Sequence, residues 1–83
     1  MLNEGVWAVI KVSGEHLRLF SEDNPLGVQA SVYDVSTKKW VAPSEPVENI
    51  EHGKEKATEY AEAHLKRSNL ELPPLIWKTA RSA

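Results

Sequence analysis

The 83-residue chain contains no cysteine, which excludes disulfide bonds, thiolate metal ligands and a thiol nucleophile. No apolar run approaches the roughly 20 residues that a membrane-spanning helix needs. The segment 1–12 includes the acidic residue Glu4 and has no basic n-region, so it is not typical of a signal peptide. We therefore expect a cytoplasmic protein that does not enter a membrane and is stabilised by packing alone.

Sequence motifs for catalysis are also absent. The chain has no Gly-x-Ser-x-Gly elbow, no glycine-rich phosphate loop and no Gly-x-Gly-x-x-Gly fingerprint. Glu55, Glu59 and Glu62 recur at helical spacing, which favours a solvated helix face over an acid–base pair. We therefore predict that the chain is not an enzyme and that it has neither catalytic nor cofactor-binding residues.

Three histidines are the first candidates for metal ligands: His16, His52 and His64. They form no His-Glu-x-x-His motif and have no cysteine partner, so their spacing does not match a zinc site. The sequence therefore predicts no metal site. His64 falls at the border of an apolar helix stripe, and we expect its ring to be half-buried.

Hydrophobic residues and charge point to one small folded domain. Leu, Ile, Val and Phe make up 20 of the 83 residues, above the roughly 20% that is typical of disordered chains. The net charge is −2, and a chain of this size buries roughly 60% of its surface. Acidic residues are in excess over 44–72, whereas 73–83 carries two cations and no acid. No block of like charge is long enough to indicate a tail for nucleic acid.

Four segments combine β-branched, aromatic and alternating residues and are predicted to be strands: 6–12, 15–20, 28–33 and 40–42. Ser13 and Gly14 suit a tight turn between the first two strands. The segment 21–27 is predicted to be a loop because it is rich in turn residues. Pro43 and Pro46 lack a backbone donor, so we expect them to end the fourth strand and to form a rigid connector.

A helix is predicted over 54–67, because its apolar residues recur at helical spacing. Gly53 is one candidate for the N-cap, and Asn49 is the other if the helix begins earlier. Ser68-Asn69 is expected to end it, since asparagine tolerates the left-handed conformation. The apolar stripe consists of Ala57, Tyr60, Ala61 and Leu65. These elements predict an α+β fold: a three- to four-stranded antiparallel meander packed on one face by a single C-terminal amphipathic helix.

The domain is expected to span 1–69, followed by an extended apolar arm over 70–83. Pro73-Pro74 prevents the helix from continuing, and Leu75-Ile76-Trp77 is predicted to form a short strand or an extended segment. Five of the eight residues from 70 to 77 are apolar, excluding the prolines. We therefore expect the arm to pack on a partner or on the domain, where it would close one edge of the sheet or cover the face opposite the helix.

Strand alternation separates the two faces of the predicted sheet. One face is aliphatic and should meet the helix: Val6, Ala8, Ile10, Val12, Leu17, Leu19, Val28, Ala30 and Val32. The other face combines aromatic rings with basic groups. With the arm, it defines a candidate interaction surface: Trp7, Lys11, Arg18, Phe20, Tyr33, Lys39 and Trp77.

These features favour a small non-enzymatic binding module. The leading interpretation is protein–protein interaction through the aromatic sheet face or the arm, and a homodimer formed by arm exchange is one such arrangement. The alternative is single-stranded nucleic acid, because aromatic rings on a sheet can stack unpaired bases. The third is a small enzyme subunit whose site forms on dimerisation. The sequence does not identify the partner.

Overall fold

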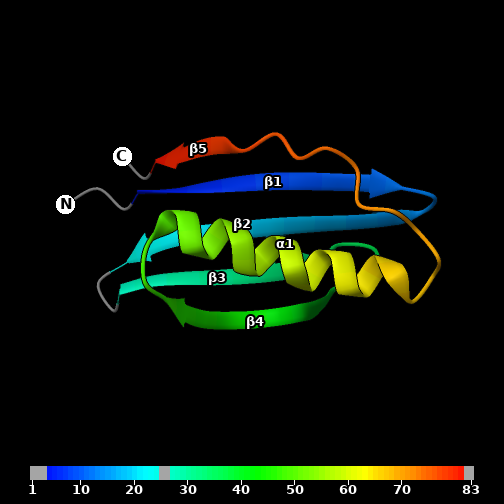
Figure 1. The fold of residues 1–83 in the computed structure, drawn as a ribbon, viewed down its shortest axis with the longest axis horizontal. Helices are drawn as coiled ribbons and strands as arrows, with labels where there is room; N and C mark the ends of the chain where they lie inside the picture. The colour runs from blue at the N-terminus through cyan, green and yellow to red at the C-terminus, as the bar shows by residue number, and fades with distance from the viewer. Residues whose placement is uncertain (1–3, 25–26, 82–83) are drawn as a thin grey trace.

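A computed structural model describes residues 4–24 and 27–81. The elements follow in the order β1 (Glu4–Val12), β2 (Glu15–Asn24), β3 (Gly27–Asp34), β4 (Lys39–Val47), α1 (Ile50–Lys66) and β5 (Lys78–Arg81). All strand pairs are antiparallel, and the sheet has the order β4-β3-β2-β1-β5 with the helix on one face (Figure 1). The predicted α+β fold is therefore confirmed, with a fifth strand that the sequence did not predict.

The β1–β2 turn forms where it was expected. Ser13 and Gly14 have φ angles of 45° and 84°, and they connect the paired residues Val12 and Glu15. Two consecutive positive φ angles are characteristic of the type I′ turn, whose twist matches that of the flanking strands. This turn fixes the β1–β2 register, and the register in turn decides which side chains share a face.

The prediction of a loop over 21–27 is wrong for most of that segment. The β2–β3 ladder continues through Asp23 paired with Val28 and closes with Asn24 paired with Gly27. Residues 25–26, including Pro25, lie outside the described part of the chain. Backbone pairing along two long strands outweighs the local turn preference of Asp and Asn.

The prediction that the fourth strand ends at its prolines is also wrong. Strand β4 runs on to Val47, so Pro43 and Pro46 neither end the strand nor form a separate connector. Because β4 is an edge strand, a proline can lie in it without breaking a ladder on its outer side. The β3–β4 register also shifts twice, between Ala30 and Val32 and again between Val32 and Tyr33.

The helix has well-defined caps. Asn49 is the N-cap: its φ is −161°, and its side-chain oxygen accepts a hydrogen bond of 2.8 Å from the backbone N–H of His52. Gly53 was the wrong candidate, since it lies one turn inside the helix. At the other end Asn69 has a φ of 56°, and the N–H of Leu70 donates to the carbonyl of Leu65 as in a Schellman motif.

Small side chains let the helix lie close to the sheet. Its buried residues are Gly53, Ala57, Ala61 and Leu65, and they meet the aliphatic face predicted from strand alternation. The closest approach is at Ser21 of β2, whose hydroxyl donates to the carbonyl of Ile50 over 2.8 Å. A Cβ atom at position 53 would lie 2.0 Å from the Ser21 Oγ.

The C-terminal segment packs on the helix side of the sheet. Leu70, Leu72, Leu75 and Trp77 contact the core, and the ammonium of Lys54 lies 5.7 Å from the centre of the Trp77 ring. Figure 1 shows this segment running along β1 before β5 pairs with it. Within the described ranges, no helix is long and apolar enough to span a membrane.

We predict that Gly53→Ala destabilises the protein. Alanine is the better helix former by about 1 kcal/mol, but overpacking against Ser21 costs about 1–3 kcal/mol. Urea unfolding followed by circular dichroism measures the change. Glu62→Ala, on the exposed side of the same helix, is the control and should change the unfolding free energy by less than about 0.5 kcal/mol. A Gly53→Ala variant more stable than the wild type by about 1 kcal/mol, the full difference in helix propensity, would show that the helix and sheet are not in close contact.

The neighbouring residues 76 and 77 test the packing of the C-terminal segment. Trp77→Ala should lower the unfolding free energy by about 2 kcal/mol, below the range for a fully buried tryptophan because this ring is half-buried. Ile76→Ala is the matched control, since Ile76 is 75% exposed and should have little effect. Thermal unfolding measures both variants, and equal losses of stability in Trp77→Ala and Ile76→Ala would argue against the packing of Trp77 on the core.

Candidate functional site

The sheet face opposite the helix is the first candidate site. Strand register places one set of described side chains on this open sheet face: Trp7, Val9, Lys11, Arg18, Phe20, Tyr33, Trp40 and Lys78. Trp40 is 55% exposed and Val9 is 36% exposed, whereas Trp7, Phe20 and Tyr33 are half-buried. Both the helix and the C-terminal segment pack on the other side, so neither covers this face.

The rings of the open sheet face are held by specific contacts. Tyr33 and Trp40 pack edge to face, with ring centres 4.9 Å apart and planes at 68°. The ammonium of Lys78 lies 5.3 Å from the centre of the Trp7 ring, which is within cation–π range. Each contact joins residues that are paired across two strands, so the sheet itself holds the rings in place.

Trp40 reaches this face because of a β-bulge. Val32 pairs with Ala42, whereas the next residue of β3, Tyr33, pairs with Trp40. On a regular strand, side chains two residues apart point to the same face, so Trp40 would follow Ala42 into the core. The extra residue of the bulge turns Trp40 to the opposite face. Sequence reasoning missed Trp40 as a site residue because alternation alone does not reveal a bulge.

Charge is divided between the two sides of the molecule. The open sheet face carries three cations, Lys11, Arg18 and Lys78, and among its described residues Glu22 is the one acid. The helix instead has a small excess of acid: it carries three lysines and exposes four glutamates, Glu51, Glu55, Glu59 and Glu62. A chain with net charge −2 therefore presents a positive face.

Two of the residues predicted for the interaction surface lie elsewhere. Lys39 pairs with Asp34 on the helix side, at the edge of the sheet, and Trp77 packs beside the helix. The other five predicted residues share the open sheet face: Trp7, Lys11, Arg18, Phe20 and Tyr33. Lys78 joins them through β5, which the sequence analysis treated as part of the arm.

A second group of side chains meets near the C-terminal end of the helix. His64 Nε2 lies 3.3 Å from Glu15 Oε2 and 3.7 Å from Asp34 Oδ2, and one ligand atom from each residue lies within 4.8 Å of the others. His64 is half-buried, as predicted from its helix position. The two carboxylates were missed, although their alternation places them with Leu17 and Val32 on the core side, where a charge is unexpected.

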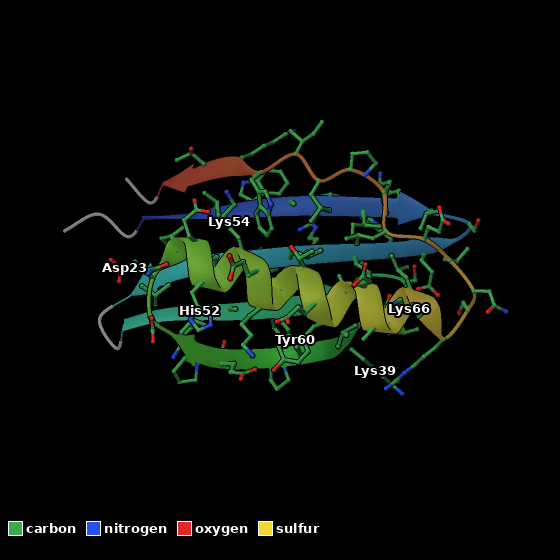
Figure 2. All side chains as sticks on the ribbon, in the orientation of Figure 1. Asp23, Lys39, His52, Lys54, Tyr60 and Lys66 are labelled. Carbon is green, nitrogen blue, oxygen red and sulfur yellow. The ribbon has the colours of Figure 1, made fainter. Side chains whose placement is uncertain are left out.

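This cluster opens into a pocket of about 350 Å³ between the helix and the edge of the sheet. Figure 2 shows Tyr60 and Lys39 at this edge. The Tyr60 hydroxyl donates a hydrogen bond to the Glu45 carboxylate of β4. This bond, together with partial burial and the charge of Glu45, raises the pKa of Tyr60 above its usual value.

Comparison with known proteins finds no protein-family model that matches the chain, no similar curated protein and no similar solved structure.

The Tyr60–Glu45 contact predicts a change at alkaline pH. Folding raises the pKa of Tyr60, so the contribution of this contact to the free energy of unfolding is fully present below about pH 10. That contribution is lost as the pH rises through the raised pKa of the folded state. Glu45→Gln removes the negative charge and should lower the pKa of Tyr60. Tyrosinate absorbance measures this in a Tyr33→Phe background, which leaves a single tyrosine. Glu48→Gln is the control, and an unchanged titration in Glu45→Gln would show that the contact is absent.

Proposed function

We propose that the protein is a non-enzymatic binding module whose open sheet face binds an acidic segment of a partner protein. The observation that carries this proposal is that neither the helix nor the C-terminal segment, as far as the structure describes them, covers this face, which presents Trp7, Tyr33, Trp40 and Arg18 together. Trp, Tyr and Arg are the residues that most often dominate the binding energy of protein interfaces. An exposed and ordered group of them is typical of an interaction site.

Charge favours an acidic partner. The three cations of the open sheet face are exposed and are opposed there by Glu22 alone among the described residues. Complementary charge steers encounter and selects against basic partners. The glutamates of the helix lie on the opposite layer, so they do not repel a partner that approaches the open sheet face (Figure 1).

The arrangement of the rings favours a protein over a stack of bases. Base stacking needs free ring faces. Here the Lys78 ammonium lies over Trp7, and Tyr33 is packed against Trp40. The exposed Trp40 and the aliphatic side chain of Val9 suit packing against apolar side chains instead.

Site-specific photo-crosslinking in the native cell tests this proposal. A photoreactive phenylalanine derivative at position 9 should form an adduct with another protein, and the crosslinked peptide should be rich in Asp and Glu. The same residue at position 59, on the exposed helix side, should form none. Arg18→Glu should lower the yield by about tenfold, which corresponds to ~1.4 kcal/mol. Lys66→Glu makes the same charge change on the other layer and should have no effect.

Three outcomes would overturn the proposal. An adduct at position 59 as strong as that at position 9 would mean that the open sheet face has no special role. An adduct with a second copy of this chain would indicate a homodimer. A nuclease-sensitive adduct would indicate nucleic acid.

Single-stranded nucleic acid is the second candidate, because the positive face suits a phosphate backbone. Neutralising three phosphates would give a slope of about −2 for the logarithm of affinity against that of salt concentration. Titration with oligothymidine, followed by tryptophan fluorescence, measures this slope. The Trp40→Phe variant identifies the emission of Trp40, and an unchanged spectrum at low salt would exclude this candidate.

A further inference from the structure

The two carboxylates of Glu15 and Asp34 lie on neighbouring strands and face the same helix residue. The β2–β3 ladder brings the start of β2 next to the end of β3, and the helix places His64 above them. The β2–β3 ladder and the helix that packs on it therefore bring together ligands that are far apart in sequence. This is why the spacing of the histidines alone gave no indication of a metal site.

Asp34 shows the properties of an oriented metal ligand. Its side chain is only 6% exposed. Oδ1 accepts hydrogen bonds from the backbone N–H groups of Ser36, at 2.9 Å, and Thr37, at 3.3 Å. Within the described chain, Oδ2 has no hydrogen-bond donor, and its nearest polar partner is His64 Nε2 at 3.7 Å. One oxygen is thus held by the turn while the other points into the cluster.

The carboxylates of the cluster carry negative charge that a cation would balance. Two carboxylates face each other across a half-buried space, and neither Lys39 nor Arg67 forms an ion pair with them in the described part of the protein. A neutral imidazole leaves a site of charge −2. A protonated His64 would balance only half of that charge, whereas a divalent ion between the three groups would balance all of it.

The distances are close to those of the second arrangement. Bonds of 2.0–2.2 Å from a tetrahedral zinc ion separate its nitrogen and oxygen ligands by about 3.3–3.6 Å. His64 Nε2 lies 3.3 Å from the Glu15 oxygen and 3.7 Å from the Asp34 oxygen, and the three ligand atoms lie within 4.8 Å of one another, so small side-chain movements would bring them to an ion. The imidazole also favours zinc and its neighbours over calcium and magnesium, which prefer oxygen ligands.

We propose that Glu15, Asp34 and His64 bind one divalent transition-metal ion of the zinc type. Three protein ligands leave a coordination position for water, as in sites that exchange ligands. Asp34 and His64 also line the pocket of about 350 Å³, which provides a path for the ion and for water. This site is independent of the open sheet face, since it lies on the other side of the sheet.

Titration of the chelator-treated protein with zinc chloride tests the proposal. Isothermal calorimetry should show one saturable site per chain, and cobalt chloride should give the visible absorption of a four-coordinate ion. Asp34→Asn and Glu15→Gln should each weaken binding at least tenfold. His52→Gln removes a helix histidine outside the cluster and is the matched control, which should bind zinc like the wild type.

A measurement on the wild-type protein avoids dependence on the folding of these variants. Zinc should shift the ring-nitrogen resonances of His64 in nuclear magnetic resonance spectra and leave those of His16 and His52 unchanged. The proposal is wrong if no saturable binding occurs. It is also wrong if the His16 or His52 resonances move with zinc and those of His64 do not, or if His52→Gln removes the binding.

Discussion

The close contact between one helix and one sheet face is the constraint on which the rest of the structure depends. Gly53, Ala57 and Ala61 present little more than backbone to the sheet, so the helix axis lies near the strands. A helix this close covers mainly β2 and β3 and reaches β4 and β1 only in part. The C-terminal segment fills the space left over β1, where Leu75 and Trp77 complete the same core.

Because the helix and the C-terminal segment pack on the same side of the sheet, the two faces of the sheet differ in what they carry. Both covering segments pack on one face, and residues 4–24 and 27–81 contain no further element that covers the other. The open sheet face therefore keeps half-buried rings that are supported by the strands alone. The metal-ligand cluster has the same origin, since the helix reaches the β2–β3 ladder where Glu15 and Asp34 meet below His64.

Much of this fold was predictable from local patterns. Alternation assigned Ala8, Ile10 and Leu19 to the core, and Ser13-Gly14 marked a turn whose φ angles the structure confirms. The errors came where tertiary pairing outweighs local preference. Pro43 and Pro46 lie within β4 because an edge strand tolerates them, and β5 forms because β1 offers an unpaired edge.

The candidate sites were likewise predictable only as far as strand alternation reaches. Alternation placed Trp7, Arg18 and Tyr33 together, and the register agrees. It did not identify Trp40, which depends on a bulge, or assign Lys39 to the helix side. Glu15 and Asp34 were visible as charges at core-facing positions, but only the ladder shows that they meet.

The two edges of the sheet restrict how this protein can associate. Outer strand β4 is interrupted by two prolines and by two register shifts, and β5 is four residues long with Lys78 at its start. Both features hinder the addition of another strand and so protect against polymerisation into fibrils. Association through side chains on a flat surface is consequently favoured over growth of the sheet.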